Sequence, residues 1–195
     1  MGLVYRRRLR AICRRFDNPQ QTVMVDPKDL AARGVTVLVL DFDGVLAPHG
    51  SETPLPEVGQ WLRSCAATFG GSGIFILSNR PDPVRIDYFR RKFPEFHFVS
   101  GVRKKPYPDG LERVMEISGA VPGQIMMFDD RLLTGVLGAC LAGVEVMYIT
   151  APYVSLKDRP LIELFFMLLR YAERKAVALA CLLSGERPGA GQTPG

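Results

Sequence analysis

Short apolar runs, rich in valine, isoleucine and phenylalanine, alternate along most of this chain with segments whose apolar residues recur at helical spacing. The runs predict β-strands, and the segments between them predict helices. Strands that alternate with helices form right-handed crossovers, which build a parallel sheet covered on both faces. The pattern therefore predicts a three-layer α/β sandwich, with strands at 35–41, 73–77, 96–99, 125–128 and 144–149 and helices at 54–70, 83–93, 111–117 and 132–141.

The two ends of the chain depart from this alternation. A short helix is predicted to begin at Asp26-Pro27 and to end at Gly34. After Pro152, a helix start at 158–160 leads into two apolar parts, which a charged stretch at 170–175 separates. Neither part approaches the roughly 20 residues that a membrane span needs, so we expect packing on the body of the protein. A subunit contact or a membrane face remains open as an alternative.

Length and composition favour one folded domain. The chain has 195 residues, of which 47% are hydrophobic, enough for one sizeable core. We assign residues 1–19 to a basic N-terminal arm, 20–183 to the domain, including an apolar C-terminal helix, and 184–195 to a disordered tail rich in glycine and proline. Four widely spaced cysteines argue against a zinc site and fit a reducing compartment. Composition leaves the oligomeric state open.

Positive charge is concentrated in the arm. Residues 1–15 hold six arginines and no acid, so the net charge of +5 leaves −1 for the remaining 180 residues. A near-neutral body argues against nucleic acid as a partner. The arginines of residues 1–16 alternate with apolar residues, which predicts an amphipathic helix on an anionic membrane surface. A solvated arm and an organellar transit peptide are the alternatives, so the expected location is cytoplasmic and peripheral on the membrane, or the mitochondrial matrix.

Asp41 and Asp43 carry the strongest chemical signal. They follow an apolar run directly, and side chains two residues apart in a strand share a face. Both carboxylates can therefore converge at the carboxyl end of a strand, where open α/β sheets bind ligands. Two like charges so close are costly unless a cation compensates, and Mg²⁺ prefers carboxylate oxygens. The pair predicts a magnesium site.

Three further groups follow later strands. Ser78-Asn79 ends one strand, Lys104-Lys105 comes after the next, and Asp129-Asp130 ends the one after that. Each group alone has an ordinary structural explanation, such as a helix cap or a solvated loop. Together they provide a nucleophile, an acid/base, an oxyanion binder, a cation and metal ligands, the set needed for phosphoryl transfer through an aspartyl-phosphate.

The two histidines carry less. His97 is expected to be a strand residue, and His49 a surface-loop residue within reach of a substrate.

The order Asp-x-Asp-Gly, Ser-Asn, Lys-Pro and an acid pair resembles the four motifs of the haloacid dehalogenase-like (HAD) phosphatases. More closely, the chain resembles their subclass IIIA, YqeG-like branch, which includes phosphatidylglycerophosphate phosphatases; residues 130–139 match its fourth motif and 103–106 its third. The resemblance implies a Rossmann-like, HAD-type core with a mostly parallel sheet. Only 36 residues separate Asp43 from Asn79, and 26 separate Asn79 from Lys105, which leaves no room for a cap domain.

The resemblance also implies roles. Asp41 would be the nucleophile and Asp43 the general acid/base. Ser78 and the Asn79 backbone would hold the phosphoryl group, and Lys105, or failing that Lys104, would neutralise charge. Mg²⁺ would be bound by Asp41, the Asp43 carbonyl and Asp130.

Two positions depart from the branch's pattern. Asp129 stands where glycine is usual, and Gly135 stands where a second aspartate is usual. Asp129 is expected to compensate by binding metal or water. The leading expectation is a Mg²⁺-dependent phosphatase for phosphatidylglycerophosphate at a membrane surface. A phosphatase for a soluble phosphomonoester and a catalytically degenerate interaction protein are the alternatives.

Overall fold

A computed structural model describes residues 4–80 and 82–183. Its five strands form one sheet in which all neighbours are parallel, in the order β3-β2-β1-β4-β5. This confirms the predicted α/β fold. The strands are β1 (Val37–Leu40), β2 (Ile74–Leu77), β3 (His97–Val99), β4 (Ile125–Asp129) and β5 (Glu145–Tyr148).

Helices connect successive strands, and local sequence explains where several of them begin. The Asp26 and Asp82 carboxylates each accept a bond from a backbone N–H of the first helical turn, and a proline follows each of them. The predicted helix at 132–141 begins instead with a π-helical segment, Leu132–Val136. α2 (Pro27–Ala32) precedes β1, and the connecting helices are α3 (Pro56–Phe69), α4 (Pro83–Lys92), α5 (Asp109–Ser118) and α6 (Leu137–Ala142).

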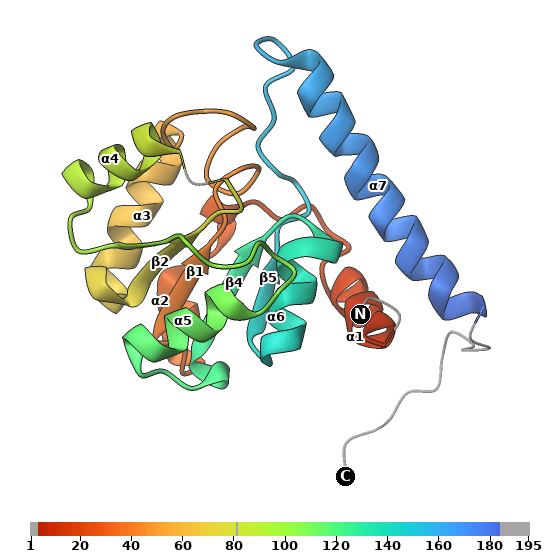
Figure 1. Ribbon diagram of the computed structural model, residues 1–195, viewed down its shortest axis with the longest axis horizontal. Helices are drawn as coiled ribbons and strands as arrows, with labels where there is room; N and C mark the ends of the chain where they lie inside the picture. Colours follow the sequence, from red (N-terminus) through yellow and green to blue (C-terminus); the bar gives the residue numbers. More distant parts are fainter. Residues whose placement is uncertain (1–3, 81, 184–195) are drawn as a thin grey trace.

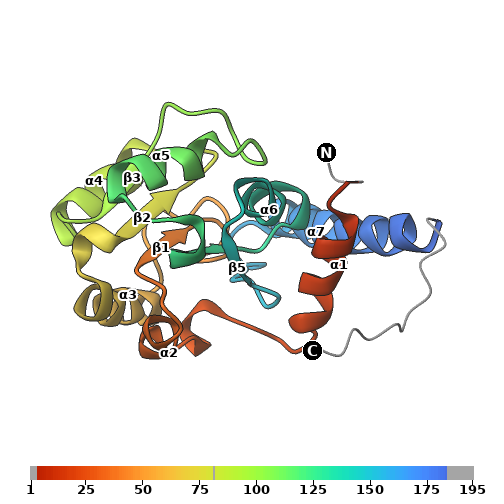
Figure 2. The ribbon, with the colours of Figure 1, turned by 90° about the horizontal axis from the view of Figure 1, so that it is seen from below.

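Each face of the sheet carries its own apolar core. α2 and α3 lie over one face, where Trp61 and Leu62 pack against Leu40 and Phe128 of the central strands. α5 and α6 lie over the other face (Figure 2), on a cluster that includes Val39 and Met127. Burial on both sides explains why these strands read as continuous apolar runs rather than as alternating ones.

Little chain is inserted between the first three strands. Residues 41–55 and α3 lead from β1 to β2, and α4 is the one helix described between β2 and β3, where residue 81 lies outside the description. The described residues therefore agree with the expected absence of a cap domain. The carboxyl edge of the sheet is left open as a result.

The N-terminal arginines belong to a packed helix. α1 (Arg6–Arg15) lies beside the C-terminal helix and α6 (Figure 2), and Leu9 is fully buried. The Arg8 guanidinium donates bonds to the carbonyls of Cys140 and Val144. The predicted amphipathic helix is thus present, with its central leucine turned toward the protein.

The C-terminal segment forms one continuous helix, α7 (Pro160–Leu183), which stands at the side of the sheet beyond α6 (Figure 1). A charged stretch at residues 170–175 was expected to separate its two apolar parts, and the helix continues through that stretch. Its buried side chains include Glu163, Arg170 and Glu173, whereas most of its apolar side chains are exposed. The first half of the helix packs through charged groups whose partners lie on adjacent loops, and the second half packs beside α1 through the buried Val177 and Cys181. None of the described helices is long and apolar enough to cross a membrane. The predicted disordered tail, 184–195, lies outside the described residues.

Candidate active site

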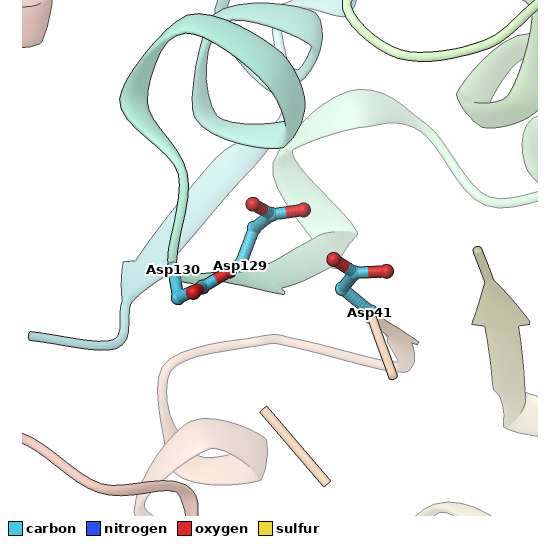
Figure 3. Close-up of side chains that lie close together, drawn as sticks. All are labelled: Asp41, Asp129 and Asp130. Atoms are coloured by element: carbon cyan, nitrogen blue, oxygen red, sulfur yellow. The ribbon is translucent and has the colours of Figure 1, made fainter. Parts of the chain in front are cut away.

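Three carboxylates meet at the carboxyl edge of the sheet. Asp41 follows β1, Asp129 ends β4, and Asp130 comes next (Figure 3). β1 and β4 are paired in register, and the Asp41 N–H donates to the Phe128 carbonyl at 3.0 Å. The backbone therefore brings the three side chains together, and each offers an oxygen within 4.8 Å of the others.

Lys105 lies between two of these acids. Its Nζ is 2.9 Å from Asp41 Oδ1 and 2.6 Å from Asp129 Oδ2. Burial alone would lower the pKa of Lys105, but the carboxylates of Asp129 and Asp41 outweigh it and raise that pKa, which keeps the ammonium charged. Lys104, the alternative predicted from the sequence, is exposed and does not line the cleft.

The side chain of Asn79 binds the backbone of Lys105 and so holds the lysine in place. The Asn79 side chain accepts a bond from the Lys105 N–H at 2.7 Å and donates one to the Lys105 carbonyl at 3.2 Å. Asn79 thus acts on Lys105 through its side chain, whereas a role in binding the phosphoryl group had been expected for its backbone. The neighbouring Ser78 lines the cleft, and its Oγ accepts a bond from the Arg80 N–H at 3.3 Å. That bond has the local capping form which short hydroxyl side chains often adopt.

Asp130 is almost fully buried and is paired with Arg170 of α7. Its Oδ2 accepts a bond from Arg170 Nε, but its Oδ1 is buried without a hydrogen-bond partner. Burial raises the pKa of Asp130 to about 6, although Arg170 opposes that rise. The chain passes closely here because Gly44 has a φ of +81°, and a Cβ at Gly44 would lie 2.6 Å from Asp130 Oδ2.

Burial also governs Asp41. It raises the pKa of Asp41 to about 7, with Lys105 lowering it and Asp129 raising it further. An unpaired buried oxygen on Asp130 and three converging carboxylates form a donor set suited to a hard divalent cation. These observations fit three of the four residues predicted to bind Mg²⁺, namely Asp41, Asp129 and Asp130; the fourth is Asp43.

The Asp43 carboxylate does not join this group. Arg85 of α4 binds it with two N–H bonds, of 2.8 and 3.0 Å, and the Gly50 N–H donates a third of 3.0 Å. Burial acts to raise the pKa of Asp43, but the Arg85 hydrogen bonds and charge outweigh it and lower that pKa. The predicted convergence of both aspartates on one ion therefore fails for the Asp43 side chain, which a local ion pair holds. Both residues still line the same cleft.

The cleft has a volume of about 410 Å³. His49 borders it and is buried, with its ring stacked on Phe166 at 3.8 Å and its N–H bonded to Glu163. The expectation that His49 is a surface-loop residue was wrong, because α7 covers it. Cationic side chains also line the cleft: Arg80, Arg85, Lys105, Arg131 and Arg159.

Asp129 accounts for the unusual glycine at position 135. A Cβ at Gly135 would lie 1.8 Å from Asp129 Oδ2, so the carboxylate and such a side chain exclude each other. Asp129 Oδ1 accepts a bond from the Arg131 N–H, which holds the carboxylate in that position. The space beside residue 135 is therefore occupied by the carboxylate of Asp129.

Several contributors were missed by sequence reasoning. Arg85 carried no signal because an arginine in the first turns of a helix is common. Arg170 and Glu173 were read as a charged interruption, and Glu173 in fact accepts bonds from Arg131 and from the Leu132 N–H. The spacing of Glu163, Arg170 and Glu173, seven and then three residues, places them on one face of a helix and was the available signal.

No protein-family model and no curated protein sequence matches this chain. Among solved structures it is similar to the cobalt-bound deoxy-D-mannose-octulosonate 8-phosphate phosphatase of Haemophilus influenzae, with 16% identity, a TM-score of 0.48 and coverage of 77% of this chain and 98% of the other. A second similar structure is that of a protein from Legionella pneumophila assigned to the HAD superfamily as a subfamily III A hydrolase. It has 14% identity and a TM-score of 0.40, with coverage of 85% of this chain and 97% of the other. An uncharacterized protein from Corynebacterium glutamicum has 23% identity and a TM-score of 0.46, with coverage of 72% of this chain and 97% of the other.

Proposed function

We propose that this protein hydrolyses phosphomonoesters through an aspartyl-phosphate on Asp41. The observation that carries the proposal is the arrangement of Asp41, Lys105, Asp129 and Asp130 at the open edge of the sheet. It supplies a carboxylate nucleophile next to a buried ammonium and two further acids. Such a set suits attack on phosphorus, because the Lys105 ammonium reduces the repulsion between the Asp41 carboxylate and the negatively charged phosphoryl group.

In the proposed first step, an Asp41 carboxylate oxygen forms a bond to phosphorus while the bond from phosphorus to the ester oxygen breaks. Asp43 gives a proton to that leaving oxygen. In the second step Asp43 takes a proton from water, the water oxygen bonds to phosphorus, and phosphate leaves as Asp41 is regenerated. Lys105 faces the phosphoryl group in both steps. Mg²⁺, held by Asp41, Asp129 and Asp130 and by the Asp43 carbonyl, would withdraw charge from the phosphoryl oxygens.

Arg85 has a defined part in this scheme. Asp43 must alternate between acid and base, and a carboxylate gripped by two guanidinium bonds is kept in one orientation. The bond from Arg85 Nε to the Ser51 carbonyl at 2.8 Å fixes the arginine in turn. Arg85 is therefore a positioning residue that holds the acid/base toward the cleft at the expense of its proton affinity.

The proposed substrate is phosphatidylglycerophosphate or a closely related lipid headgroup at a membrane surface. An uncapped cleft, in which the cations Arg80, Lys105 and Arg159 lie among an equal number of acidic and basic side chains, suits a phosphorylated headgroup whose apolar part stays outside. The YqeG-like resemblance of the sequence supports the same class. A soluble phosphomonoester is the alternative. The absence of an acid at Gly135 was the argument for a catalytically degenerate protein. That argument is weaker because the Asp129 carboxylate fills the space beside Gly135.

The test is a phosphate-release assay with Mg²⁺ on phosphatidylglycerophosphate micelles and on a panel of soluble phosphomonoesters. Asp41→Asn should lower kcat by about a thousandfold or more, because no other group replaces a covalent nucleophile. Asp29→Asn, an exposed acid of α2, is the matched control and should leave kcat unchanged.

Full activity in Asp41→Asn would refute the nucleophile assignment. Turnover of soluble esters alone would refute the lipid substrate. A wild-type protein inactive on the whole panel would favour the interaction protein.

A further inference from the structure

α7 has an inverted distribution of polarity. Its buried face carries Glu163, Arg170 and Glu173, each bound to a loop at the sheet edge. Its opposite face carries apolar side chains along its whole length, with Leu161 81%, Leu168 60% and Leu183 79% exposed. We define the outer face of α7 as the exposed apolar residues Leu161, Leu164, Phe165, Leu168, Leu179 and Leu182.

An exposed apolar face of this extent marks a surface that another body covers. The outer face does not hold α7 on the protein, because the helix is attached by its opposite side, through Glu163, Arg170 and Glu173 and through the buried Val177 and Cys181. Figure 1 shows α7 standing beside the domain with one side turned away from the sheet. The question is therefore which body covers the outer face.

Charge indicates the occupant. The acids of α7, Glu163 and Glu173, are both buried, and α1, which packs beside α7, contains none. The exposed charges of the two helices are basic, and they include Arg14 and Lys175. An apolar stripe flanked by cations and free of exposed acid is complementary to an anionic lipid surface. A second copy of the chain would instead bring two basic surfaces together, at a cost in repulsion.

The outer face also continues toward the cleft. Ile162 and Phe166, on the same two turns as Leu161 and Phe165, line the cleft wall. A bilayer against α7 would therefore lie next to the cleft opening.

We propose that α7 docks on an anionic bilayer through its outer face, lying in the interface rather than crossing it. The docking rests on the proposed function only in that the cleft would draw its substrate from the same surface. The sequence analysis assigned membrane contact to residues 1–16. Leu9 of that segment is buried, so here α1 contributes charge and α7 contributes the apolar contact.

The test is co-sedimentation of the full-length protein with vesicles of phosphatidylcholine containing phosphatidylglycerol, and with pure phosphatidylcholine. Wild-type protein should bind the anionic vesicles, and more weakly as salt is raised. Phe165→Asp and Leu168→Asp should each lower the partition coefficient about tenfold or more. Ile117→Asp, at an exposed apolar position on α5, should not lower it.

A charge pair sharpens the result. Lys175→Glu should weaken binding at least about fivefold, since each basic residue near the surface contributes about 1 kcal/mol. Lys92→Glu on α4 should have no effect. Unaltered melting temperatures establish that each variant is folded.

The proposal is overturned if the wild type does not sediment with anionic vesicles, or if Phe165→Asp binds them equally well. A wild-type dimer in sedimentation velocity that Phe165→Asp converts to a monomer, without vesicle binding, would assign the outer face to self-association. Hydrolysis of soluble p-nitrophenyl phosphate is measured in parallel. Vesicle binding without hydrolysis refutes the proposed function alone, and hydrolysis without vesicle binding refutes the docking alone.

Discussion

Asp129 and Gly135 occupy one shared volume, so each constrains what the other can be. Gly135→Asp should therefore lower stability by about 1–3 kcal/mol, because a new side chain must displace the buried Asp129 carboxylate from Lys105. The double variant Asp129→Gly/Gly135→Asp should recover much of the loss, because the carboxylate then enters from the other residue. Urea unfolding of the two variants and the wild type measures this. Additive losses in the double variant would contradict the shared volume.

Asp41 and Asp130 give the metal-free protein an unusual pH dependence. The pKa of Asp41 is about 7 and that of Asp130 about 6, both above the ordinary value of 3.8. At pH values between 3.8 and the raised pKa values, the folded protein binds more protons than the unfolded chain. Its free energy of unfolding should therefore fall as pH rises from about 4 to 7. Mg²⁺ competes with those protons and should raise the melting temperature more at pH 8 than at pH 5. Equal shifts at both pH values would contradict a carboxylate-bound ion.

The Arg85 ion pair sets the proton affinity of Asp43. Arg85→Met removes the hydrogen bonds and the charge that outweigh burial, so the pKa of Asp43 should rise. The limb of the pH profile of kcat/KM that reports Asp43 should move to higher pH in this variant. Arg91→Met, which removes an exposed arginine paired with Asp87, is the control and should leave the profile unchanged. A profile that falls in height without moving would indicate loss of position alone.

Among the elements, α7 shows the limit of reading a sequence by composition. The sheet strands were predicted to within one or two residues, because apolar runs bounded by turn residues are local signals. The charges at 170–175 were interpreted as an interruption between two apolar parts, so the burial of Arg170 and Glu173 in α7 was not expected. Glu163, Arg170 and Glu173 are buried for reasons that lie about 40 or more residues away, at Asp130, Arg131 and His49. Local patterns carry no record of such partners.

Glu173 is the element-scale test of this packing. Glu173→Ala should destabilise the protein by about 3–5 kcal/mol, because it leaves the Leu132 N–H and the Arg131 guanidinium without their acceptor. Glu116→Ala, which breaks an exposed pair with Arg113 on α5, should cost about 1 kcal/mol or less. Denaturant midpoints of both variants give the comparison. Equal costs would show that the α7 contact is not structurally important.

For the whole molecule, topology was the most predictable property. Parallel strands place their carboxyl ends at one edge, so Asp41, Lys105, Asp129 and Asp130 were expected together before any coordinates. The positions of α1 and α7 were not predictable, since they lie outside the alternating pattern that sets the order of the sheet. Their mutual packing decides which face of the molecule is apolar.

Deletion of residues 1–16 tests that packing. The deletion should lower the free energy of unfolding by at least about 2 kcal/mol, since it removes the fully buried Leu9 and uncovers the end of α7 near Cys181. Calorimetry of the shortened protein measures the change. An unaltered melting temperature would mean that these residues behave as the solvated arm considered from the sequence.

Glu163, Arg170 and Glu173 bind three separate loops to α7, which is not itself part of the sheet. The loops of the proposed active site therefore share one attachment to α7, whereas the strands are held together by their own backbone hydrogen bonds. Warming should free the helix first, so catalysis is expected to fade at temperatures where amide exchange still reports an intact sheet.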